Sequence, residues 1–140
     1  MSLGYSGLCV KVMEDDEVAI YSYAGENLND GVSKIGDALL QDGMITIYKR
    51  CLEEPEIHSR LRRMPSGKKK LVAKRIPHFP SVDEHIQNGD IMIDKECKNA
   101  FCKGYSFDYI AYRLLVHIFV NYQKKGDFLK RILLYNDLPN

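Results

Sequence analysis

Eight cationic side chains lie within sixteen consecutive residues, 60–75, and the same stretch contains no acid. It reads RLRRMPSGKKKLVAKR, and its cations are Arg60, Arg62, Arg63, Lys68, Lys69, Lys70, Lys74 and Arg75. Phosphate backbones attract such clusters because each bound cation releases counterions that are condensed on the nucleic acid. The segment contains no aromatic residue on which a base could stack. Contact with a duplex or with phosphates alone is therefore favoured over single-strand binding.

Charge is strongly polarised along the chain. Lys and Arg total 20 and Asp and Glu total 19, so the formal net charge is +1. Without the eight cations of 60–75, 12 basic residues remain against 19 acidic ones, which leaves −7 on the rest of the chain. Such asymmetry steers an anionic partner, and we expect this segment to bind nucleic acid or an acidic protein. The competing interpretation is an edge strand whose lysines serve only solubility, or a surface neutralised by Glu53, Glu54 and Glu56.

A second pattern suggests metal-dependent chemistry. Glu96 and Lys98 follow an apolar run, and Asp83 lies upstream. Two carboxylates that hold Mg²⁺, with a lysine that orients water, form the pattern of metal-dependent nucleases. Asp83 lies at an expected helix start, where an acid is also explained by the positive end of the helix dipole. A nuclease-like enzyme is therefore the alternative hypothesis, and a protein-interaction module without an anionic ligand is a third.

The cysteines do not define a metal site. They lie at positions 9, 51, 97 and 102, and the pair at 97 and 102 has no second Cys/His pair at a spacing that completes four ligands. The chain carries no secretion signal, which favours free thiols, and it has no apolar run long enough for a membrane span. We expect no metal, no cofactor and no membrane contact. The expected location is the cytoplasm, and a binding protein is favoured over an enzyme.

Three elements are expected to carry the cationic segment. Residues 55–64 have Pro55 in a first turn, acids before arginines, and apolar residues at helical spacing, so they predict a short helix with Arg60 and Arg63 on one face. Residues 65–67 predict a turn, and 68–76 predict a strand that stops at Pro77. Strand alternation places Lys68, Lys70 and Lys74 on one face, and Lys69 and Arg75 on the other.

Further strands are expected before and after this segment. Residues 8–13 and 18–23 form a hairpin around the acidic turn 14–17. Asp42-Gly43 suits a type I′ turn between strands at 38–41 and 44–48. Ser81 and Glu84 predict a capping box for a short helix that Gly89 ends, with strands at 91–94 and 132–135.

The longest expected element is a helix over 107–125, with Ser106 as its N-cap and Gly126 at its end. It is apolar almost all round, apart from a polar stripe of Arg113, His117 and Asn121. We expect it to pack on a sheet, and its surplus apolar surface raises self-association into a homo-oligomer as a hypothesis.

The order of these elements predicts one α+β domain over residues 1–140. Its mainly antiparallel sheet should have about five to seven short strands, packed against one long C-terminal helix and two short helices.

Overall fold

The larger of two antiparallel sheets has five strands in the order β6-β3-β2-β1-β7, and the smaller sheet pairs β4 with β5. The computed structural model describes residues 5–27, 41–96 and 108–137. The strands of the larger sheet are β1 (Tyr5–Glu14), β2 (Val18–Asn27), β3 (Gly43–Tyr48), β6 (Ile91–Lys95) and β7 (Arg131–Asp137). The other elements are a 3₁₀ turn (Lys49–Cys51), β4 (Glu56–Arg63), β5 (Lys69–Ile76), α1 (Val82–Gln87) and α2 (Tyr109–Lys125). The expected α+β class with a mostly antiparallel sheet is confirmed.

The β1–β2 hairpin forms where the alternation of residue types predicts it. Its turn is held by the Asp15 carboxylate, whose Oδ1 accepts hydrogen bonds of 2.8 Å from the backbone N–H groups of Glu17 and Val18. A short acidic side chain that bonds its own backbone is a typical turn device. Cys9 and Tyr23 pair across the two strands and are both fully buried, so this face of the hairpin belongs to the core.

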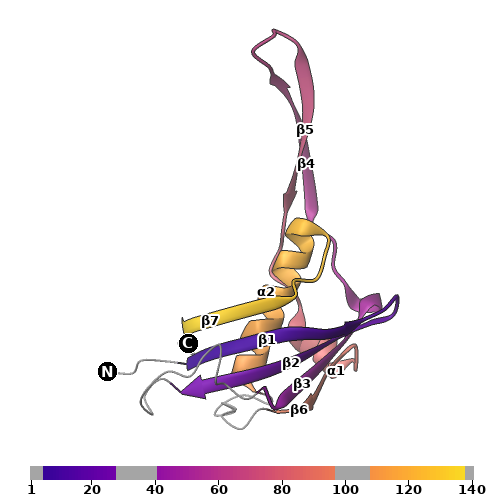
Figure 1. The fold of residues 1–140 in the computed structure, drawn as a ribbon. Coiled ribbons are helices and arrows are strands. Elements are labelled where there is room, and N and C mark those ends of the chain that lie inside the picture. Colours follow the sequence, from indigo (N-terminus) through magenta and orange to yellow (C-terminus); the bar gives the residue numbers. More distant parts are fainter. Residues whose placement is uncertain (1–4, 28–40, 97–107, 138–140) are drawn as a thin grey trace.

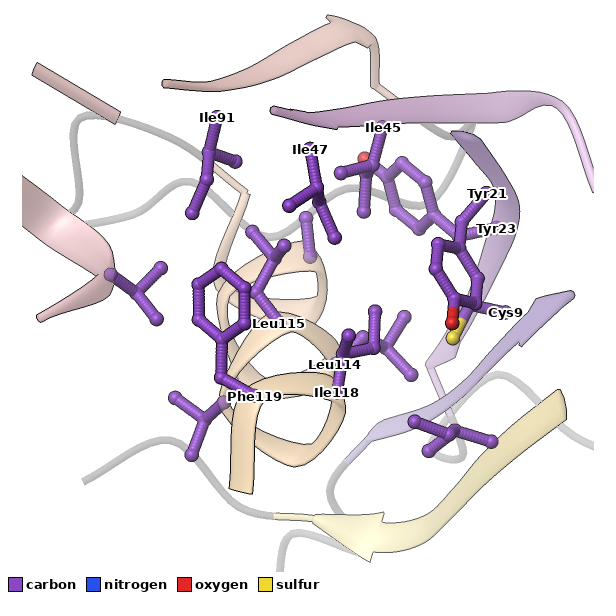
Figure 2. Close-up of a cluster of buried hydrophobic side chains, with 14 of the residues drawn as sticks. Cys9, Tyr21, Tyr23, Ile45, Ile47, Ile91, Leu114, Leu115, Ile118 and Phe119 are labelled. Atoms are coloured by element: carbon purple, nitrogen blue, oxygen red, sulfur yellow. The ribbon is translucent and has the colours of Figure 1, made fainter. Parts of the chain in front are cut away.

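Helix α2 covers one face of the five-stranded sheet (Figure 1). Its buried residues meet the inward side chains of the central strands (Figure 2), and the labelled members are Cys9, Tyr21, Tyr23, Ile45, Ile47, Ile91, Leu114, Leu115, Ile118 and Phe119. The expected surplus of apolar surface on this helix is therefore buried within the chain itself. The helix is the one long helix of the described residues, and β7 follows it toward the C-terminus. Among those residues, no helix has the length and apolar character needed to cross a membrane.

The ends of α2 show how buried polar groups are satisfied. Asp108 is the N-cap, and its Oδ1 accepts a hydrogen bond of 3.0 Å from the N–H of Ile110. Its Oδ2 accepts a second bond of 2.8 Å from the hydroxyl of Tyr23, so a fully buried carboxylate is tied to β2. The expected cap, Ser106, lies outside the described residues. Gly126 ends the helix in the left-handed conformation, as predicted.

Helix α1 confirms its predicted place but not its predicted cap. Ser81 is the N-cap residue, yet its side chain makes no capping hydrogen bond. Its backbone N–H donates instead to the carboxylate of Glu53, at 3.0 Å. Gly89 has φ of +79° just after the helix, as expected for its stop.

Gly43 is a strand residue and not part of a type I′ turn. It opens β3 and pairs with Tyr23 of β2. A Cβ atom at Gly43 would collide with the Tyr23 ring, so the glycine is required by close packing and not by a positive φ. The predicted partner strand at 38–41 lies almost wholly outside the described residues.

The predicted helix over 55–64 is wrong. Glu56–Arg63 forms β4, which pairs with β5 over eight rungs from Glu56–Ile76 to Arg63–Lys69. Pairing with β5, in which the partners lie six to twenty positions further along the chain, decides this conformation and overrides a local charge order that suits a helix. As a consequence, Arg60 and Arg63 lie on opposite faces of the hairpin and do not share one. One of the two expected short helices is thus a strand, and α1 is the other.

Candidate functional site

The β4–β5 hairpin projects from the body as a free-standing arm (Figure 1). We call β4, the turn at 64–68 and β5 together the arm. Every side chain of β4 is exposed, and so are six of the eight in β5. All eight cations predicted as a candidate site lie on this arm. An isolated two-stranded hairpin is at best marginally stable in water, so a partner that covers the arm would stabilise it.

The tip of the arm is a tight three-residue turn. The N–H of Gly67 donates to the carbonyl of Met64 at 2.9 Å, and the N–H of Met64 donates to the carbonyl of Lys68 at 2.8 Å. Gly67 has φ of +83°, which only glycine adopts without strain. Pro65 and Ser66 suit the two central positions of such a turn. The predicted turn at 65–67 is therefore confirmed, as the end of a hairpin and not of a helix.

The register divides the arm into two faces with different chemistry. Residues that pair directly across the strands point to the same face, and successive residues alternate. The cationic face consists of Glu56, His58, Arg60, Arg62, Lys70, Val72, Lys74 and Ile76. The apolar face consists of Ile57, Ser59, Leu61, Arg63, Lys69, Leu71, Ala73 and Arg75.

Four cations are brought together on the cationic face. Arg62 and Lys70 form one rung, and Arg60 and Lys74 lie on diagonal positions of the next two rungs. Lys68 lies between the turn at 65–67 and the first residue of β5, two positions before Lys70 of this cluster. The other three cations lie at the ends of the apolar face, with Arg63 and Lys69 paired near the tip and Arg75 near the base. The eight cations are therefore split between two faces.

No cation of the arm is neutralised by an acid within the part of the chain that the structure describes. The six ion pairs found there involve none of the eight. Glu56, which could have paired with an arginine, contacts Nε2 of His58 at 2.8 Å. Glu53 faces His78 and His85. The ion pairs of the described residues therefore do not support the competing interpretation, in which Glu53, Glu54 and Glu56 neutralise the cationic segment.

Three cations of the body behave in the opposite way. Lys11 and Lys49 both contact the carboxylate of Glu14, at 2.6 and 2.8 Å. The hydrogen bond from Lys11, followed by that from Lys49, lowers the pKa of Glu14. Arg50 donates to Asp90 at 2.6 Å, and this bond raises the pKa of the guanidinium. These body cations are compensated locally, whereas the arm presents its charge to the surroundings.

Helix α2 holds the base of the arm by a buried amide. The side chain of Gln123 is almost fully buried, and its Oε1 accepts a bond of 3.0 Å from the N–H of His78. Its Nε2 donates back to the carbonyl of the same residue, also at 3.0 Å. Two bonds to one backbone unit fix the chain just after β5. The arm is thus mounted on the core helix.

A carboxylate joins the two sides of the base. Oε2 of Glu53, which precedes β4, lies 3.2 Å from Nε2 of His85 and accepts the 3.0 Å bond from the Ser81 N–H. His78 Nε2 lies 3.2 Å from the carbonyl oxygen of Glu54. The segments that enter and leave the arm are thereby tied to each other and to α1.

A hollow of about 380 Å³ opens on the arm. Its lining residues are His58, Ser59, Arg60, Val72, Lys74 and Ile76. Most of them belong to the cationic face, so the hollow combines cationic head groups with a short apolar floor. Such a surface suits a sugar–phosphate unit.

The alternative nuclease residues do not form a described cluster. Asp83 is exposed in the first turn of α1, Glu96 is exposed just after β6, and Lys98 lies outside the described residues. Within the described ranges, no group of three or more His, Cys, Asp or Glu residues is arranged to hold a metal ion. Cys9 and Cys51 are free and buried, and the other two cysteines lie outside those ranges.

Two features of the arm escaped prediction. One is His58 on the cationic face, and the other is an exposed apolar cluster of Ile57, Leu61 and Leu71 on the opposite face. Both follow from the alternation of side chains in a strand, which the predicted helix concealed. The period-two order Ile57, Ser59, Leu61 was the available signal.

Comparison of the chain with protein-family models, with curated proteins and with solved structures finds no match.

Proposed function

We propose that this protein binds duplex DNA through the β4–β5 arm. The observation that carries the proposal is a projecting hairpin with eight cations that no described acid neutralises. Binding replaces the counterions around the phosphates by these side chains, and the released counterions provide much of the binding free energy. The body carries the compensating negative charge, which disfavours contact between DNA and the rest of the chain.

The dimensions of the arm support a duplex groove as its binding place. Eight residues per strand extend about 26 Å, and two paired strands lie about 4.8 Å apart. The major groove of B-form DNA is about 12 Å wide and admits a two-stranded ribbon. The major groove of duplex RNA is too deep and narrow for side chains to read. Duplex DNA is therefore the form that fits best.

The composition of the arm disfavours single-stranded nucleic acid. Stacking on aromatic rings supplies much of the affinity for single strands. Neither strand of the arm carries an aromatic ring apart from the imidazole of His58. Long cationic side chains, by contrast, reach phosphates on both sides of a groove.

The test is fluorescence anisotropy with a labelled 20-base-pair DNA, titrated with the full chain at several salt concentrations. We expect binding that weakens steeply with salt, and weaker binding to the single strand of the same length. Polyglutamate of equal charge serves as the acidic-protein competitor. Equal affinity for polyglutamate and duplex would show that the arm recognises charge alone, and absence of duplex binding at low salt would refute the proposal.

A further inference from the structure

The apolar face of the arm is unusual for a free-standing hairpin. Ile57, Leu61 and Leu71 are 62%, 64% and 64% exposed, and Leu61 pairs directly with Leu71 across the strands. The next rung toward the base holds the small residues Ser59 and Ala73. An exposed leucine pair with an isoleucine further along the same face is informative because burying these side chains in a complex is favourable.

We infer that this apolar face lies on the floor of the DNA major groove and recognises thymine methyl groups. The inference rests on the proposed function and extends it to the orientation of the arm and to the sequence that it prefers. Among the base-edge groups that the major groove displays, the thymine C5-methyl is the apolar one. A face with a leucine pair near its middle and an isoleucine toward its base cannot match the hydrogen-bonding pattern of the other groups.

The distribution of charge is compatible with this orientation. Cations occur on the apolar face only at its ends, where Arg63 and Lys69 lie near the tip and Arg75 near the base. Arg63 and Lys69 can meet phosphates at the edge of the groove, whereas the guanidinium of Arg75 lies beside Gly126 at the end of α2. The cations of the opposite face have long, flexible stems, so their head groups can reach the backbones that border the groove.

The opposite orientation makes a different prediction. If the cationic face pointed to the floor, Arg60, Arg62 and Lys70 would contact guanine O6 and N7, the commonest specific contacts of such side chains. Leu61 and Leu71 would then stay in water, and their burial would contribute nothing. The two orientations therefore differ in which base atoms matter.

The experiment compares four duplexes of one length at one salt concentration, of which the last two share a sequence. The first alternates A and T, the second has every thymine replaced by deoxyuridine, and the last two are G·C-rich, one with guanine and one with 7-deazaguanine. Loss of one buried methyl corresponds to about a fourfold weakening, so the deoxyuridine duplex should bind at least about fourfold more weakly. Replacement of guanine N7 should have no effect.

A paired variant attributes the effect to the arm. Leu61→Ala with Leu71→Ala should weaken binding to the thymine duplex and abolish the difference between thymine and deoxyuridine. Because these side chains are exposed, the body keeps its fold, which circular dichroism checks. Ala73→Gly, on the same face, serves as a control that removes little apolar surface.

Each outcome has a defined meaning. Failure of every duplex to bind in a salt-dependent manner would refute the proposed function itself. Salt-dependent binding whose affinity does not change when the thymine methyl is removed, or falls when guanine N7 is replaced, would support the proposed function but overturn this orientation. A dimer of the free protein that dissociates in the double leucine variant would also overturn it, since a second copy would then cover the apolar face.

Discussion

Replacement of Lys70 by glutamine removes one charge from the cationic face and keeps a similar stem length. Lys70 pairs with Arg62 and is exposed, and no acid among the described residues contacts it. Its loss should therefore not disturb the fold. We expect weaker DNA binding and, more specifically, a binding constant that depends less on salt.

The structure sets the size of this effect. Four cations, Arg60, Arg62, Lys70 and Lys74, share the cationic face. Counting these four alone, without the cations at the ends of the apolar face, gives a minimum log–log salt slope of about −3.6, at about 0.9 counterion released per phosphate contact. A rise from about 50 to about 200 mM salt would then lower the DNA affinity of the wild type about 150-fold. The Lys70→Gln variant, with a slope of about −2.7, would lose affinity only about 40-fold over the same range.

The assay is anisotropy at five salt concentrations for the wild type and the variant. Lys95→Gln is the matched control, because Lys95 is also exposed but lies at the end of β6, away from the arm (Figure 1). It should leave the slope unchanged. If both variants reduce the slope equally, net charge alone governs binding and the argument from the arm fails.

Two further predictions concern the body. Gln123→Leu removes both hydrogen bonds to the backbone of His78; leaving these groups without partners should lower the free energy of unfolding by about 1–3 kcal/mol in urea denaturation, and an unchanged value would contradict the anchoring role. Glu14→Gln should cost about 0.2–1 kcal/mol at neutral pH, because Lys11 and Lys49 lose a partially exposed partner. Because the folded state lowers the pKa of Glu14, the wild type has this stability above the ordinary value of 4.5 and loses it as pH falls through the lowered pKa. The variant should lack that part of the pH dependence in thermal unfolding.

Local sequence patterns predicted two kinds of element correctly. These are strands that pair with a neighbour in the sequence and helices with a regular apolar periodicity. The β1–β2 hairpin follows from alternation and an acidic turn, and α2 follows from its length and from Gly126 at its end. Local signals failed at β4, where Pro55 and the order of charges favour a helix. The strand conformation of β4 is stabilised by its pairing with β5. The residues of β4 alone do not reveal this partner.

The candidate site shows the same limit. Its eight cations were identified as a group from the sequence, because charge density needs no structural information. Their division into two faces requires the register of the hairpin, which places Arg60 diagonally to Lys74. The hydrogen bonds between Gln123 and His78 join positions 45 residues apart, so no short-range sequence pattern predicts them. Similarly, the competing interpretation paired Glu53 with the cations, yet its carboxylate faces His85.

A residue-resolved map by ¹⁵N-¹H NMR during titration with duplex DNA tests most directly whether the arm is the DNA-binding surface. We predict that amide shifts concentrate between Glu56 and Ile76, on both strands of the arm, while the amides of the larger sheet and of α2 move little. Shifts that concentrate on the body, with an unchanged arm, would contradict this prediction.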